Sequence, residues 1–171
     1  MEKLNKKDAA LENRRLAAKK YQPEKIKLLL IAEAPPRSED RYFYFENVSE
    51  QDSLFRYVVR CVLNVEPIRE RKAEQLEALK NAGVFLIDSV TTPLQSGEKL
   101  RDSINTASLV SRCQDLNSKA IILIKANVYD EVFDVLKNAD LPVINERIPF
   151  PGSGQQTRFV NSFQKALTKI R

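Results

Sequence analysis

The chain contains no histidine among its 171 residues. Histidine is the usual general base near neutral pH and a common metal ligand, so triads, metal sites and proton transfers that need an imidazole are excluded. Any catalysis must depend on carboxylates, lysine, tyrosine, hydroxyls, thiols or main-chain dipoles. This single absence removes much of ordinary enzyme chemistry.

Cysteine and long apolar runs are also scarce. Cys61 and Cys113 lie in helix-like apolar patterns without metal-ligand spacing, so we expect both to be reduced core residues. No apolar run approaches the ~18 residues of a membrane span, and the charged N-terminus lacks the apolar centre of a secretory signal. We expect a cytoplasmic monomer with no membrane partner, no metal and no other cofactor.

The composition is that of a folded domain. Hydrophobic residues make up 43% and charged residues 30% of the chain, as in globular proteins. Its length suits one domain over residues 1–171. The net charge of +5 permits a polyanionic partner such as DNA without requiring one.

Strand-like and helix-like segments alternate along the chain. An N-terminal helix is expected over 4–20, within the segment 1–22, and ends before Pro23. Further helices are expected from Ser49 and over 68–83, 99–116, 127–140 and 156–170. Apolar runs predict strands at 25–32, 84–90, 120–125 and 142–145. This alternation predicts an α/β fold with three α/β/α layers around a central, mainly parallel four-stranded sheet.

Ligands of open α/β sheets bind outside the carboxyl ends of the strands. Three loops meet that criterion, over 32–46, 88–97 and 146–156. The first, "AEAPPRSEDRYFYF", is stiffened by two prolines. Glu33 either points into a pocket or pairs with Arg37 or Arg41. The aromatic run 42–45 either packs in the core or holds a ring for stacking on a base.

The second and third loops offer weaker signals. Asp88 ends an apolar strand, so its carboxylate either caps the following loop or accepts hydrogen bonds from a ligand. Gly152, Ser153 and Gly154 precede a helix. Their main-chain N–H groups either form an ordinary turn or hold an anion such as phosphate.

The first loop resembles the "GEAPG…E-D" motif of the thermostable bacterial and archaeal class of uracil-DNA glycosylases. The resemblance extends from about Lys25 to Leu167 and implies a uracil-DNA glycosylase-like fold. The matching residues are Glu33, Ala34, Pro35, Glu39 and Asp40, whereas Ala32 and Pro36 replace glycines of the motif.

The resemblance implies roles for several residues. Phe45, with Phe43 as the alternative, falls where the family stacks a Phe on the extruded uracil. Asp88 stands where the family has an Asn that reads the base edge, and an ionised carboxylate can only accept hydrogen bonds. Phe150 stands where the family has the His that supports the departing base. The water-activating Asp of the best-known branch falls at Ala34, and the iron–sulfur cysteines are absent.

Two functions follow from these residues. As an atypical DNA glycosylase, the protein would use Glu33 and Asp88 catalytically and would hold the base with Ala34, Pro35 and an aromatic ring. The 152–154 backbone and Arg158 would hold DNA phosphate or the departing base, and Arg37 and Arg41 would hold phosphate. As an inactive relative, it would only bind a nucleobase, nucleotide or nucleic acid. A third interpretation is a protein partner on the charged helix 68–82.

The glycosylase interpretation predicts one cleft lined by Glu33, Phe45, Asp88 and Ser153. It also needs a substitute for the missing His, and the nearby candidates are Arg147, Ser153 and Gln155. A cleft filled by Phe150 would argue against catalysis.

Overall fold

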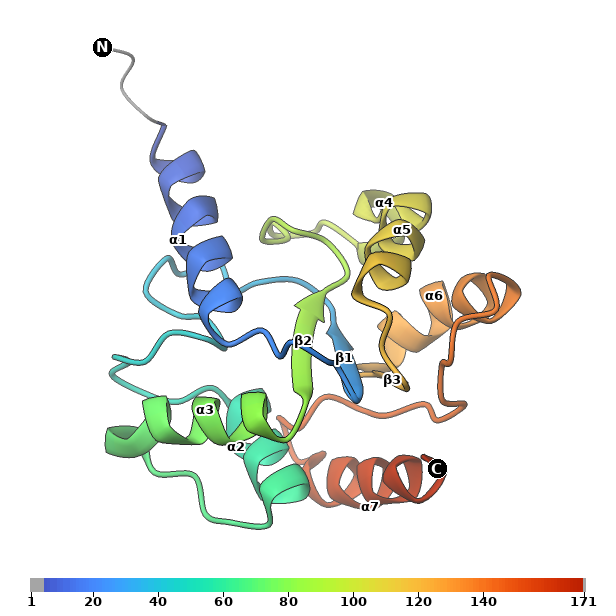
Figure 1. Ribbon diagram of the computed structural model, residues 1–171. Helices are drawn as coiled ribbons and strands as arrows, with labels where there is room; N and C mark the ends of the chain where they lie inside the picture. The colour runs from blue at the N-terminus through green and yellow to red at the C-terminus, as the bar shows by residue number, and fades with distance from the viewer. Residues whose placement is uncertain (1–4, 171) are drawn as a thin grey trace.

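Three short parallel strands form the centre of the molecule (Figure 1). The computed structural model describes residues 5–170. The strands in this part of the chain lie in the order β2-β1-β3, with bounds β1 (Leu28–Ala32), β2 (Val84–Asp88) and β3 (Ile121–Leu123). Both pairings of the central strand β1 are parallel. The parallel α/β class predicted from the sequence is confirmed.

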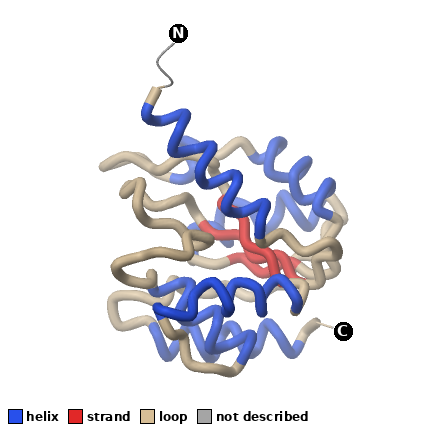
Figure 2. Tube along the Cα trace, turned by 60° about the vertical axis from the view of Figure 1, so that its left-hand side comes forward, coloured by secondary structure: helices blue, strands red, loops and turns tan. Residues whose placement is uncertain are grey.

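Helices cover both sides of this sheet. Their bounds are α1 (Lys6–Lys20), α2 (Ser53–Val58), α3 (Lys72–Asn81), α4 (Leu100–Ser103), α5 (Thr106–Leu116), α6 (Ala126–Asn138) and α7 (Gln156–Thr168). A π-helical turn, Val59–Leu63, continues α2, and a 3₁₀ turn, Arg69–Arg71, precedes α3. In Figure 1, α2, α3 and α7 lie on one side of the sheet and α4, α5 and α6 on the other. Figure 2 shows the strands between these helices from a second direction.

The apolar strands supply the middle of the core. All five residues of β1 and all three of β3 are buried, which explains their continuous apolar runs. On the side of α2 and α7, Phe55, Phe159 and Phe163 are fully buried. Cys61 and Cys113 are also buried and form no disulfide, as the apolar patterns predicted.

The predicted fourth strand does not form, and the sheet described here has three strands. Residues 142–145 touch β3 through one bridge, Ile121↔Val143, and the chain returns at Ile124↔Ile148. Between these bridges the backbone bonds to itself, since the Glu146 N–H donates to the Ile144 carbonyl at 3.0 Å. A continuous ladder needs those groups to face β3, so the segment stays irregular.

Two of the differences from the predicted helices are explained by side-chain caps. The helix expected from Ser49 begins at Ser53, because Asp52 is its N-cap and accepts a hydrogen bond from the Phe55 N–H at 2.7 Å. The helix expected over 99–116 is interrupted. Asn105 caps a new start by accepting from the Ser108 N–H at 2.9 Å. A polar side chain that bonds the backbone three residues onward starts a helix.

No helix within residues 5–170 has the length and apolar character needed to cross a membrane.

The exposed edge of β2 is closed by a side chain. The Tyr44 hydroxyl donates to the Leu86 carbonyl at 2.8 Å and lies 2.6 Å from the Leu86 nitrogen, whose N–H it accepts. Tyr44 is 3% exposed, so water cannot replace these two bonds. The Tyr44 hydroxyl therefore bonds the edge of β2 as a neighbouring strand would, and it anchors the 33–46 loop to the sheet.

Replacing Tyr44 with phenylalanine should lower the free energy of unfolding by about 2 kcal/mol, because it leaves a buried N–H and a buried C=O of Leu86 without partners. Urea denaturation measures the change. Tyr57→Phe is the matched control, since the Tyr57 hydroxyl makes no hydrogen bond within residues 5–170. Equal stability of the Tyr44 variant and the wild type would contradict this description of the edge.

Candidate functional site

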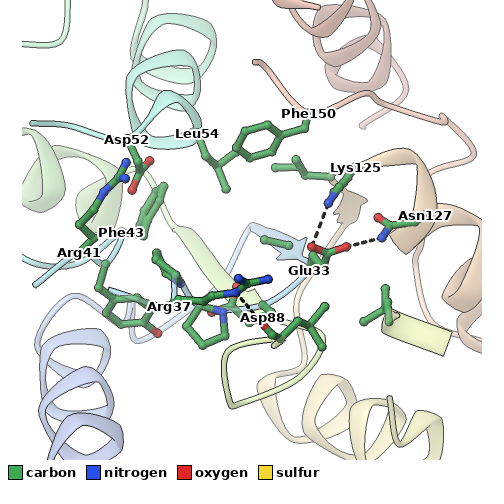
Figure 3. A pocket seen from close by; sticks show the side chains of 18 of the residues that line it. Glu33, Arg37, Arg41, Phe43, Asp52, Leu54, Asp88, Lys125, Asn127 and Phe150 are labelled. Atoms are coloured by element: carbon green, nitrogen blue, oxygen red, sulfur yellow. Dashed lines mark hydrogen bonds and ion pairs between the residues drawn. The ribbon is translucent and has the colours of Figure 1, made fainter. Parts of the chain in front are cut away.

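A cavity of about 610 Å³ opens at the carboxyl ends of the strands. The strand register pairs Ala32 with Asp88, and the pairing continues beyond the strands through the Ser89 N–H to the Ala32 carbonyl at 2.7 Å. The loops after β1 and β2 therefore begin side by side. Figure 3 shows side chains from both loops, together with Lys125 after β3, around this one cavity.

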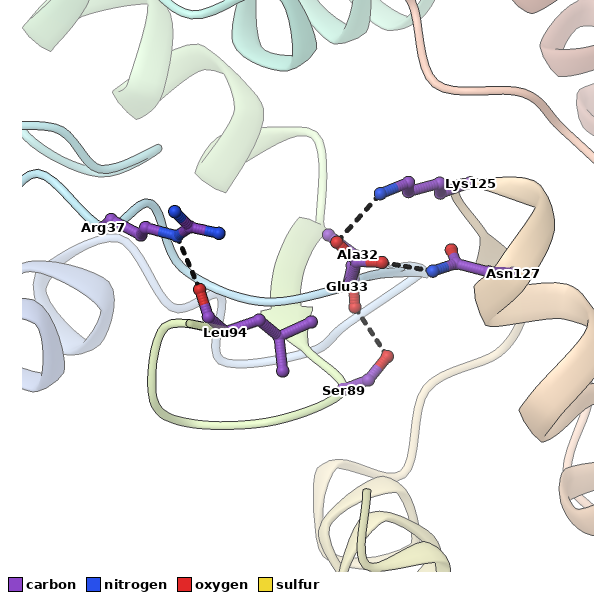
Figure 4. Close-up of polar contacts among 7 residues, drawn as sticks. All are labelled: Ala32, Glu33, Arg37, Ser89, Leu94, Lys125 and Asn127. Carbon is purple, nitrogen blue, oxygen red and sulfur yellow. Dashed lines mark hydrogen bonds and ion pairs between the residues drawn. The ribbon is translucent and has the colours of Figure 1, made fainter. Parts of the chain in front are cut away.

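Glu33 is held in the cavity through both of its carboxylate oxygens. One carboxylate oxygen accepts a hydrogen bond from the Lys125 ammonium at 2.9 Å, and the other accepts from the Asn127 side-chain amide (Figure 4). Its partner is thus neither Arg37 nor Arg41, the pairing considered from the sequence. Two of the roughly four lone pairs of a carboxylate remain available to a ligand or water.

Lys125 holds an unusual backbone conformation at the junction of β3 and α6. Its φ of 86° and ψ of 135° lie in a region that favours glycine. Hydrogen bonds fix this conformation: the Lys125 N–H donates to Ile148 at 3.0 Å, and the Lys125 carbonyl accepts from Val128 at 3.1 Å. Such strain, of order 1–3 kcal/mol, persists where surrounding structure enforces it and clusters at functional sites.

Asp88 contributes a second carboxyl group with different surroundings. Its side chain is half-buried and lines the cavity, and it accepts no hydrogen bond from any side chain or main-chain group within residues 5–170. Burial raises the pKa of Asp88 to about 7, although Arg14 and Arg112 oppose this change. Near neutral pH the group is therefore present both as an acid and as a carboxylate.

The cavity wall formed by the first loop is held in place from two directions. The buried Arg14 of α1 donates to the carbonyls of Pro36 at 2.7 Å and Ser38 at 3.0 Å. Arg37 donates to the Leu94 carbonyl at 2.7 Å, which ties the first loop to the second (Figure 4). The two prolines and these bonds make the wall rigid before a ligand arrives.

The structure brings most of the residues predicted for the site together. Those that line the cavity are Glu33, Ala34, Pro35, Arg37, Arg41, Phe43 and Asp88. Of the two aromatic candidates, the alternative, Phe43, lies here. Phe45 instead packs edge-on against Tyr42 at 5.4 Å and lines a separate hollow beside α1.

The third loop reaches the cavity through Phe150 alone among the residues described. Gly152, Ser153 and Gly154 lie beyond it, and Arg158 is exposed on α7. Phe150 is 40% exposed, and Figure 3 shows its ring at one side of the cavity. The cavity remains open, so Phe150 forms part of its wall and does not fill it.

Lys125 and Asn127 are site residues that the sequence analysis missed. The cations considered there included Arg147, which is bound to Asp130 at 2.9 Å outside the cavity. The sequence feature that could have indicated this site is the position of Lys125, which lies directly between an apolar strand and a helix with no loop to separate them. Within residues 5–170, no three His, Cys, Asp or Glu side chains gather closely enough to hold a metal ion.

The buried side chain of Lys72 contacts the aromatic part of the first loop. It is 1% exposed, its ammonium lies 4.7 Å from the centre of the Phe55 ring, and it donates to the Tyr42 carbonyl at 3.2 Å. Burial lowers the pKa of Lys72 to about 8, although Asp52 opposes this change. The buried ammonium therefore costs stability at neutral pH.

Replacing Lys72 with methionine should raise the free energy of unfolding by about 1–2 kcal/mol at pH 7, since it removes a buried charge and keeps most of the volume. Because the unfolded state binds the proton more tightly, the wild type gains stability between pH 8 and about 10.4. The advantage of the variant should therefore shrink at pH 10. Urea titrations at both pH values measure this, with the exposed Lys137→Met on α6 as control. A variant that is no more stable than the wild type at pH 7, or whose gain in stability is equal at pH 7 and pH 10, would contradict this prediction.

No protein-family model, curated protein or solved structure matches this chain, so its function must be inferred from the site.

Proposed function

We propose that the protein is an atypical uracil-DNA glycosylase-like enzyme that binds a base extruded from DNA and hydrolyses its N-glycosidic bond. The observation that carries this proposal is the meeting of two carboxyl groups in unlike surroundings, Glu33 and Asp88, in one cavity at the carboxyl ends of β1 and β2. The parallel sheet with helices on both sides supports the glycosylase-like fold that the motif of the first loop implies.

The size and lining of the cavity suit a nucleobase. Its volume lies within the ~300–1,000 Å³ typical of small-molecule sites. Leu54, Leu86, Ile124 and Phe43 supply apolar surface, and aromatic contact with a base contributes about 1–3 kcal/mol. A few polar groups of the lining then select the ligand by hydrogen bonds to the edge of its ring. This mixture is typical of sites that hold a flat heterocycle taken out of a base stack.

Basic residues at the cavity can attract the DNA backbone. Arg37 and Arg41 are exposed and line it, as does Lys99. A guanidinium group can bind phosphate through two parallel N–H···O hydrogen bonds. The net charge of +5 also favours association with a polyanion. The base would enter the cavity while its flanking phosphates remain at these arginines.

Glu33 is the group that activates water in this proposal. Lys125 and Asn127 hold its carboxylate in one orientation, and its free lone pairs accept a proton from water. The water oxygen then bonds to C1′ of the sugar as the bond from C1′ to the base nitrogen breaks. A positioned carboxylate contributes a factor of about 10²–10⁴ to such a step.

A second candidate function is binding without hydrolysis. The observation that favours it is that both oxygens of Glu33 already have protein partners, as in an ion pair that only shapes a pocket. The protein would then hold a nucleobase, a nucleotide or an unstacked base in nucleic acid.

A strand-cleavage assay separates the two functions. Labelled single- and double-stranded oligonucleotides carry one uracil, hypoxanthine or xanthine, are incubated with protein in excess, and are cleaved by alkali wherever a base has been lost. Release of at least one base by the wild-type protein is the expected result. Intact strands in every case, with DNA binding retained, would establish binding without hydrolysis.

A further inference from the structure

Two carboxyl groups of the same cavity have opposite surroundings. Glu33 is ion-paired with Lys125 and bonded to Asn127, whereas Asp88 has no hydrogen-bond partner for its carboxyl group within residues 5–170. Figure 3 shows both side chains in this cavity. Two carboxyl groups in such unlike surroundings can divide the roles of base and acid between them.

The two arginines whose charges lower the pKa of Asp88 have other partners. Arg112 of α5 donates to the main-chain carbonyls of Asp88 at 2.9 Å and Ser89 at 2.8 Å. Arg14 of α1 donates to the carbonyls of Pro36 and Ser38. Their guanidinium groups are thus held by the backbone and do not bond the Asp88 carboxyl group, which remains free to keep its proton.

The remaining groups around Asp88 are acidic or weakly acidic. They come from the N-cap of α2, the end of β1 and the aromatic loop, and they are Asp52, Glu33, Tyr42 and Tyr44. Burial is the main cause that raises the pKa of Asp88 to about 7, and the Asp52 and Glu33 charges act in the same direction. Proton donors in enzymes work best with a pKa near the working pH.

We propose that Asp88 is the proton donor to the departing base, so that a carboxylic acid performs the supporting role for which no histidine is present. This proposal rests on the proposed hydrolysis. As the bond from C1′ to the base nitrogen breaks, its electron pair moves onto the base, and a nitrogen or exocyclic oxygen of the base takes the proton of Asp88. Water supplies the hydroxyl group at C1′, and Glu33 takes the proton that this water loses. Both carboxyl groups exchange protons with solvent afterwards.

This role defines the class of substrate. A proton donor is needed most for a base that departs poorly as an anion, and least for a base whose substituents already stabilise negative charge. Uracil and 5-fluorouracil differ in this property while having nearly the same shape, because fluorine withdraws electrons from the ring. The contribution of Asp88 should therefore be larger for uracil than for 5-fluorouracil.

The test is a single-turnover pH–rate profile for release of uracil and of 5-fluorouracil, with wild type beside Asp88→Asn. Wild-type rates should fall above about pH 7, since the acid form is lost as the pH rises through its pKa. Asp88→Asn should remove this decline. It should also lower the rate at pH 6 about 100-fold for uracil and at most about tenfold for 5-fluorouracil.

Asp52→Asn is the matched control. Asp52 lines the same cavity, and asparagine preserves the N-cap of α2. Its profile should keep the decline, moved to slightly lower pH, because one acidic neighbour of Asp88 has lost its charge. Base release by Asp88→Asn with an unchanged decline, or with equal losses for both bases, would overturn this proposal alone. No release of either base by the wild type would overturn the proposed function and this role with it.

Discussion

Replacing Glu33 with glutamine is expected to slow base release at least about 100-fold while changing DNA affinity less than about threefold. A glutamine cannot take a proton from water. Its amide would also place an N–H₂ group opposite either the Lys125 ammonium or the Asn127 amide, both of which donate to Glu33 in the wild type. The variant therefore lacks a general base. The side chain at position 33 also loses the orientation that Lys125 and Asn127 give to the wild-type carboxylate.

Single-turnover cleavage gives the rate, and fluorescence anisotropy of a labelled oligonucleotide gives the affinity. Glu39→Gln is the control, because Glu39 is exposed on the same loop and does not line the cavity. Its rate should stay within about twofold of the wild type. A Glu33→Gln protein as fast as the wild type would remove Glu33 from the reaction and leave it a part of the wall.

Two replacements of Lys125 should differ in stability and have the same effect on activity. Lys125→Gly and Lys125→Met both remove the ammonium that holds Glu33, and a catalytic group displaced by about 1 Å can lose roughly 100-fold in rate. Only glycine also relieves the backbone strain at φ 86°. After the larger entropy of the unfolded glycine chain is subtracted, Lys125→Gly should be about 1 kcal/mol more stable than Lys125→Met.

Urea denaturation and single-turnover kinetics on the same preparations measure both effects. A glycine variant that is more stable and inactive would mean that the strained backbone serves to position the ammonium. A glycine variant that is less stable than the methionine variant would contradict the strain. One that keeps wild-type activity would show that Glu33 does not need its ion pair.

The position of the site was predictable because parallel strands bring their carboxyl ends to one edge. Glu33 and Asp88 each follow an apolar run directly, so the prediction of parallel strands already placed them close together. The sequence could not give their partners. Lys125 reaches Glu33 across 92 positions of the chain, and its strained backbone depends on a hydrogen bond to Ile148, a residue of the irregular segment after α6.

The choice between neighbouring aromatic residues depends on the path of the loop, which follows no regular period. Phe43 faces the cavity and Tyr44 faces β2, where its hydroxyl bonds Leu86. Phe45 then turns toward α1. The bond to Leu86 fixes the direction of Tyr44, and Phe43 and Phe45 point elsewhere. The local pattern of apolar residues does not indicate this long-range bond.

The failure of the fourth strand has a similar origin. Residues 142–145 carry an apolar pattern suited to a strand, but β3 extends over only three residues and then gives way to α6 at Lys125. The segment after α6 meets this edge at Ile121 and again at Ile124, just beyond β3, and leaves the edge between the two bridges. The same early end of β3 brings Lys125 and Asn127 into the cavity.

Equilibrium binding shows whether this cavity holds a base taken out of DNA, as we propose. A labelled duplex with one 2′-fluoro-2′-deoxyuridine opposite guanine keeps its N-glycosidic bond, because fluorine disfavours positive charge at C1′. Anisotropy compares its affinity with that of the fully paired cytosine duplex at one salt concentration. We expect the uracil duplex to bind at least about tenfold more tightly, since a mismatched base is the easier one to extrude. Equal affinities for the two duplexes would contradict it.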